Sequence, residues 1–132
     1  MDARVYLAKI NSNRAKIANK LREKQYWLEM AEGTALNMGG DRVQSSSNKH
    51  PMETRVIEAV MIDKEIEQLK QEITDIIKTI ERLHPKDYTF LHQVYVQGKQ
   101  LKAICAESGR SYSWATTAHR KALKRLQRIL DE

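Results

Sequence analysis

The feature that most constrains the fold is an isoleucine-rich heptad repeat within residues 53–83. Its apolar residues are spaced alternately by four and three positions, which is typical of a helix that buries one stripe against another helix. The seam comprises Ile62, Ile66, Leu69, Ile73, Ile76, Ile80 and Leu83. Charged residues occupy many positions between them and suit a solvated face. The repeat predicts a long helix over residues 53–83, and Pro85 then ends it or starts the next helix.

A second amphipathic helix is predicted over residues 3–30, because apolar residues recur there at helical spacing. They are Leu7, Ile10, Ile17, Leu21 and Leu28, and Arg14 and Lys24 interrupt the same stripe. Residues 31–52 contain Gly33, a Gly39–Gly40 pair, three consecutive serines and Pro51, which together indicate a loop. Two partners for the heptad seam stay open at this point: the helix of residues 3–30, or the same helix of a second chain. Self-association, with a dimer favoured, is the expectation.

The last third of the chain predicts shorter helices. Residues 85–97 form the first, with Tyr88, Leu91, Val94 and Tyr95 as inward candidates and Gly98 as the closing residue. Leu101, Ile104 and Cys105 form the buried face of a short second helix, and Gly109 supplies a tight turn. Ser111 is placed to cap a third, longer helix, on which Ala115, Ala118 and Ala122 permit a close crossing. This order is the helix-turn-helix pattern. We therefore predict an all-α chain, with an antiparallel helical hairpin or coiled coil over residues 1–84 and a helix-turn-helix domain over residues 85–132.

The charge distribution favours a polyanionic partner for the second of these regions. Residues 85–132 carry nine Lys and Arg against four Asp and Glu, whereas residues 1–84 carry fourteen against thirteen. On the third helix, hydroxyl side chains lie where a recognition helix meets base edges in the major groove of double-stranded DNA. The candidate base-edge residues are Tyr112, Ser113, Thr116 and Thr117. The candidate phosphate contacts are Lys99, Lys102, Arg110, Arg120, Lys121 and Lys124.

The segment VYVQGKQLKAICAESGRSYSWATTAHRKALKRL resembles region 4 of the sigma-70 type transcription factors. The matching features are Tyr95 before Gly98, Leu101 with Ile104, the turn of Gly109 and Ser111, and the final Ala122, Leu123 and Leu126. The resemblance places base-reading positions on Tyr112, Ser113 and Thr117 and a backbone-contacting position on Thr116. Region 4 often has Arg, Glu and Gln at such positions, so the resemblance does not transfer a promoter −35 preference. Ser108 and Arg110 also depart from the apolar residues common there.

Nearly the whole chain also resembles small phage and prophage proteins akin to the ArpU and RinA late-gene regulators. The resemblance rests on a G-D-R-V-Q-S-S segment (residues 40–46) after the first helix, and on a charged coil before the sigma-like domain. It implies a phage-type transcriptional regulator that binds double-stranded DNA in a bacterial cytoplasm. Two alternatives stay open: a DNA-packaging component resembling a small terminase subunit, and an adaptor that binds RNA polymerase.

Other classes of function find little support in the sequence. Phosphate-binding, zinc-protease and serine-hydrolase motifs are missing, and the acidic residues are spread along the coil, so no enzyme activity and no cofactor are expected. One cysteine and scattered histidines predict neither a disulfide nor a metal site. Cys105 is expected to be a small core residue and His119 a surface residue, and the burial of Trp114 is left open. The charged N-terminus and the lack of an 18-residue apolar run predict a soluble, cytoplasmic protein with no membrane contact.

Overall fold

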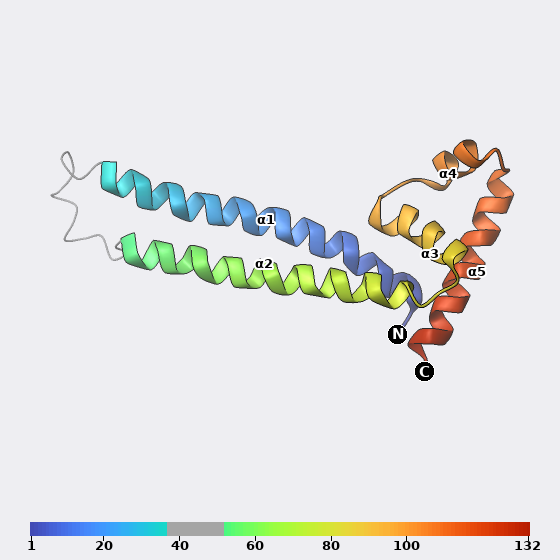
Figure 1. Cartoon of the computed structure of the whole chain (residues 1–132). Coiled ribbons are helices and arrows are strands. Elements are labelled where there is room, and N and C mark those ends of the chain that lie inside the picture. Colours follow the sequence, from blue (N-terminus) through green and yellow to red (C-terminus); the bar gives the residue numbers. More distant parts are fainter. Residues whose placement is uncertain (37–51) are drawn as a thin grey trace. The chain divides into compact units, whose positions relative to one another are not determined.

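The computed structural model describes the backbone of residues 1–36 and 52–132, and the side chains of residues 1–30 and 53–132. The described backbone is helical and contains no strand, so the predicted all-α class is confirmed (Figure 1). The G-D-R-V-Q-S-S segment and most of the predicted loop lie outside the described residues.

The first helix, α1 (Ala3–Leu36), is longer than the sequence pattern predicts. The expected break at residue 31 is wrong, since the helix continues through Gly33. A single glycine costs a helix only about 1 kcal/mol relative to alanine, and its neighbours Ala31, Glu32 and Ala35 favour the helical state. At its other end α1 is capped by Asp2, whose Oδ1 accepts the backbone N–H of Arg4 at 2.7 Å.

The second helix, α2 (Met52–Ile80), contains the heptad seam up to Ile80, and Leu83 lies beyond the end of the helix. Ile62, Ile66, Ile76, Ile80 and Leu83 are buried within a single chain, while Leu69 and Ile73 are half-buried. The helix stops shortly before Pro85, which takes the first position of α3 (Pro85–Leu91). The His84 side chain caps α3 by accepting the backbone N–H of Lys86 at 3.2 Å.

The remaining helices follow one another closely. α3 runs directly into η2 (His92–Val96), a single stretch of π-helix. Gly98 then adopts a φ of 73°, and the next N–H, that of Lys99, donates to the Gln93 carbonyl at 2.9 Å. Two further helices complete the chain, α4 (Leu101–Ser108) and α5 (Tyr112–Leu130). Gly98 is thus the predicted closing residue, in the left-handed conformation that glycine adopts without strain.

The chain divides into two compact units that cut across α1 and α2. Unit 1 comprises residues 1–14 and 71–132, and unit 2 comprises residues 15–70. These units differ in their limits from the predicted domains 1–84 and 85–132, which stay a prediction. The start of α1 and the end of α2 therefore belong to the same packed unit as α3, α4 and α5.

The core of unit 1 joins segments that are far apart in the sequence. Its largest fully buried side chains are Leu7, Ile10, Ile80, Leu91 and Leu126. Polar contacts fasten the start of α1 to this core: the Tyr6 hydroxyl donates to Thr79 Oγ1 at 2.9 Å, and Gln127 Oε1 accepts the Ala3 N–H at 2.7 Å. Arg14, predicted to interrupt the apolar stripe, donates to the Val96 carbonyl. Residues from the start of α1 and from the middle of the chain thus share the core of unit 1 with α5.

Unit 2 pairs the later part of α1 with the earlier part of α2. Lys24 forms an ion pair with Asp63 at 2.8 Å, and Lys20 forms one with Glu65. The hydrogen bond and charge of Glu65 raise the pKa of Lys20 above its usual value. The predicted stripe of α1 is wrong at Leu21, which is 52% exposed, because lysines at positions 20 and 24 occupy the side that contacts α2.

Candidate nucleic-acid interface

The turn between α4 and α5 is built by the two residues that the sequence indicates. Gly109 caps α4 with a φ of 69°, and the following Arg110 N–H donates to the Cys105 carbonyl at 2.9 Å. No atom lies within 4 Å of the place where a Cβ would stand on Gly109, so its backbone conformation alone selects glycine. Ser111 then caps α5, its hydroxyl oxygen accepting the Trp114 N–H at 3.1 Å. Two capped helix ends thus fix the path of the chain between α4 and α5.

The first turns of α5 present hydroxyl groups to solvent. Tyr112 is 52% exposed, and Ser113 and Thr116 are exposed as well. The Thr116 hydroxyl donates back to the Ser113 carbonyl at 2.9 Å, which leaves its lone pairs and its methyl group available to a ligand. Thr117 is half-buried and lines a groove instead. Three of the four candidate base-edge residues therefore lie on an open surface.

The candidate phosphate-binding cations divide into two groups. Five of them are exposed: Lys102, Arg110, Arg120, Lys121 and Lys124. Lys99 is half-buried and forms an ion pair with Glu107 at 3.0 Å. That contact partly neutralises Lys99 and reduces the charge it can offer to a phosphate.

Trp114, whose burial the sequence leaves open, is half-buried. Its ring meets Phe90 of α3 edge to face, with centroids 5.9 Å apart, and the guanidinium of Arg110 lies 4.9 Å above its centroid. Phe90 is buried with Ile104 and Ala115 in a small second core. Sequence reasoning missed Phe90, although it lies one position before the predicted inward residue Leu91.

His119, expected to be a surface residue, is half-buried and packs against η2 and α3. Its Nε2 and the Tyr95 hydroxyl are 2.8 Å apart, and the two rings stack with centroids separated by 5.7 Å. Burial raises the pKa of Tyr95 and lowers the pKa of His119. The sequence signal was available: His119 lies four residues after the buried Ala115, on the same face of α5. Cys105 is half-buried and packs against the second core, as expected of a small core residue.

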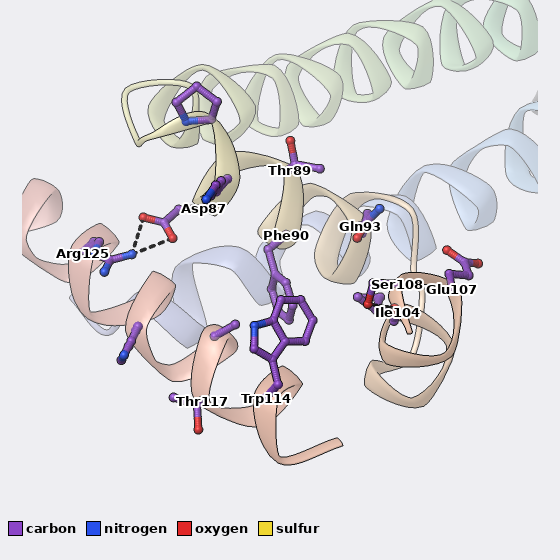
Figure 2. Close-up of a pocket in the computed structure, with 14 residues that line it drawn as sticks. Asp87, Thr89, Phe90, Gln93, Ile104, Glu107, Ser108, Trp114, Thr117 and Arg125 are labelled. Atoms are coloured by element: carbon purple, nitrogen blue, oxygen red, sulfur yellow. Dashed lines mark hydrogen bonds and ion pairs between the residues drawn. The ribbon is translucent and has the colours of Figure 1, made fainter. Parts of the chain in front are cut away.

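A groove of about 720 Å³ opens between α3, α4 and α5 (Figure 2). Phe90, Ile104 and Trp114 provide apolar walls, and Glu107, Gln93 and Thr89 lie at its border. At one side Arg125 Nη1 donates to both carboxylate oxygens of Asp87 at 2.8 Å. Asp87 is nearly buried and Arg125 is half exposed, so this pair fixes α5 to the start of α3.

The described side chains include no group of three or more His, Cys, Asp or Glu placed to hold a metal ion. In the part of the chain that the structure describes, no helix has the length and apolar character needed to cross a membrane. Comparison with protein-family models, with curated proteins and with solved structures found no significant match.

Proposed function

We propose that the chain is a DNA-binding transcriptional regulator of phage type, and that α4 and α5 form its helix-turn-helix. On this proposal α1 and α2 form an antiparallel helical hairpin that carries the helix-turn-helix. Support comes from the two ion pairs of unit 2, Lys20 with Glu65 and Lys24 with Asp63. The residue number rises along α1 from one pair to the next while it falls along α2, as in an antiparallel pair of helices. The proposal assigns no catalytic step to the chain.

One observation carries the DNA-binding proposal. The N-terminal turns of α5 carry exposed hydroxyl groups and follow a tight capped turn, and exposed cations precede and follow them along the chain. A recognition helix uses its N-terminal residues to contact base edges in the major groove. In such a complex Tyr112, Ser113 and Thr116 contact bases, and Arg110, Arg120 and Lys121 contact phosphates. Lys102 and Lys124 extend the phosphate contacts on either side.

The resemblance to ArpU- and RinA-like regulators supports phage late genes as the target. The base-edge residues are hydroxyl-bearing rather than Arg or Gln, so they lack the fixed pair of hydrogen-bonding groups with which Arg or Gln recognises one base. We therefore propose that specificity is distributed over hydroxyl contacts, methyl contacts and DNA shape, rather than over bidentate pairs.

The test is binding of the purified chain to fluorescent duplexes from its own genomic neighbourhood, measured across a salt series. The double variant Arg120→Ala/Lys121→Ala is compared with Lys9→Ala/Lys16→Ala, which removes the same charge from exposed positions of α1. We expect the first variant to weaken binding to all duplexes and to lower the slope of log K against log salt by about 2. The second variant should bind as the unmodified chain does. Equal binding by all three proteins would refute the proposed docking.

The groove beside α5 favours a second candidate, an adaptor that binds RNA polymerase through an apolar side chain. Its walls are Phe90, Ile104 and Trp114, which are suited to an aromatic or aliphatic anchor. Retention of polymerase by the immobilised chain without DNA, lost in Ile104→Asp but not in Arg120→Ala/Lys121→Ala, would support this candidate. Far-UV circular dichroism of Ile104→Asp checks that α4 and α5 still form.

A further inference from the structure

The earlier half of α2 is apolar on two opposite faces. One face contains Ala59, Ile62 and Ile66, which are buried within unit 2. The other face is an outer stripe of Val56, Ile57, Val60 and Met61, whose exposed fractions are 43%, 57%, 49% and 52%. At 3.6 residues per turn these four residues span about 140° of the helix circumference, on the side away from the seam.

An outer stripe of this kind differs from scattered exposed apolar residues. A helix that is hydrophobic on all sides is normally buried on all sides. The seam face of α2 is already covered within the chain, so its apolar area is not available to a second molecule. The outer stripe is contiguous and remains half exposed, which is the property of an interaction surface.

Charges of opposite sign bound the outer stripe at its two ends. Glu53 lies three residues before Val56, and Lys64 lies three residues after Met61, so both continue the line of the stripe along the helix. Both are exposed, and neither forms an ion pair with any described residue. The acidic end, the apolar middle and the basic end are therefore arranged symmetrically about the midpoint between Glu58 and Ala59.

We propose that the outer stripe binds a second copy of this chain, with the two α2 helices antiparallel about a twofold axis at that midpoint. Such an interface is isologous, so each contact occurs twice. Val56 meets Met61 of the second copy, and Ile57 meets Val60 of the second copy. Glu53 meets Lys64 of the second copy at each end. A parallel arrangement would place Glu53 on Glu53 and Lys64 on Lys64, which like-charge repulsion disfavours.

The size of the outer stripe sets the strength of the dimer. A standard stable interface buries about 800 Å² per partner, more than four half-exposed side chains provide. The dimer is accordingly weak, and its mass in solution depends on concentration. This inference does not rest on DNA binding, which can be measured at concentrations where the chain is monomeric.

The decisive experiment uses charge reversal and sedimentation velocity from micromolar to millimolar concentration. Glu53→Lys and Lys64→Glu each create two like-charge pairs, so each alone should dimerise about tenfold more weakly or not at all. Mixing the two variants restores both opposite-charge pairs, and the mixture should regain the dimer of the unmodified chain. The double variant Glu53→Lys/Lys64→Glu should also regain it.

A second pair of variants tests the apolar contacts. Val60→Ser should weaken the dimer, whereas Val5→Ser, which alters a valine that is 58% exposed on α1, should leave it unchanged. Circular dichroism confirms that each variant retains its helices. A chain that stays monomeric at millimolar concentration overturns the proposal, as does a dimer insensitive to Val60→Ser. Failure of the mixture to restore the dimer overturns the antiparallel register.

Discussion

The two compact units of the chain bury apolar side chains to different extents. Unit 1 fully buries Leu7, Ile10, Ile80, Leu91 and Leu126, which come from four of its helices. In the described residues of unit 2, two helical segments pack against each other, the later part of α1 and the earlier part of α2. Unit 2 buries Ala59, Ile62 and Ile66, leaves the outer stripe open, and adds ion pairs across the helix pair.

The difference follows from how many helices share a core. A core shared by several helices encloses more side chains than a core shared by two helices, so unit 1 buries more apolar residues than the described part of unit 2. Unit 1 is therefore expected to supply most of the free energy of unfolding. Unit 2 is expected to open first, since it has fewer apolar contacts to stabilise it.

The largest expected effect compares the same substitution in both units. Ile80→Ala removes a fully buried side chain from unit 1 and should cost about 3–5 kcal/mol of the free energy of unfolding. Ile66→Ala in unit 2 should cost about 2–3 kcal/mol, because the two-helix pair can close around the space more easily. Urea unfolding followed by circular dichroism measures both. Equal losses would show that the two units are packed equally well.

The second effect compares ion pairs. Asp87 is nearly buried, and its carboxylate accepts two hydrogen bonds from Arg125, so Asp87→Asn should cost about 1–3 kcal/mol. Lys24→Gln removes a more exposed pair from unit 2 and should cost below about 1 kcal/mol. The same unfolding experiment at high salt should reduce the Lys24→Gln cost further while leaving most of the Asp87→Asn cost. The opposite order would contradict the assignment of Asp87 as the fixing contact of α3.

The third effect concerns the turn before α5. Ser111→Ala removes the hydroxyl that accepts the Trp114 N–H and should cost about 1 kcal/mol. The matched control is Ser113→Ala, an exposed serine two positions later, whose loss should change stability by less than about 0.5 kcal/mol. Thermal unfolding of the two variants measures the difference. If both substitutions cost the same, the capping hydrogen bond does not stabilise unit 1.

The sequence predicted those parts of the molecule that local chemistry determines. The heptad spacing located α2, Pro85 located the start of α3, and Gly98, Gly109 and Ser111 located the helix ends. Each of these signals depends on residues within one or two helical turns. The candidate interface could be predicted for the same reason, because Tyr112, Ser113 and Thr116 follow the Ser111 cap within the first turns of the helix.

The sequence failed where packing between distant segments decides. Nothing local to α1 shows that its first turns join unit 1 through Ala3 and Tyr6, or that Leu21 is left exposed beside two lysines that pair with α2. The π-helical turn of η2 was likewise not visible in the pattern. For His119 the sequence could indicate the buried face of α5 but not the neighbours on that face, which come from α3 and η2.

The smallest expected effect uses that histidine to distinguish the units by pH. Burial lowers the pKa of His119 in the folded chain below the 6.5 of an unfolded chain. At pH values between the folded and the unfolded pKa, the unfolded chain binds more protons than the folded chain. The stability contributed by neutral His119 is therefore complete above pH 6.5 and declines as the pH falls through the folded pKa. His119→Gln cannot take up this proton, so the variant should lose less stability than the unmodified chain when the pH falls from above to below 6.5.

Urea unfolding of both proteins at the two pH values measures the difference. Hydrogen exchange should place the change in α5 and η2 of unit 1, and a change confined to unit 2 would contradict the contact between His119 and Tyr95.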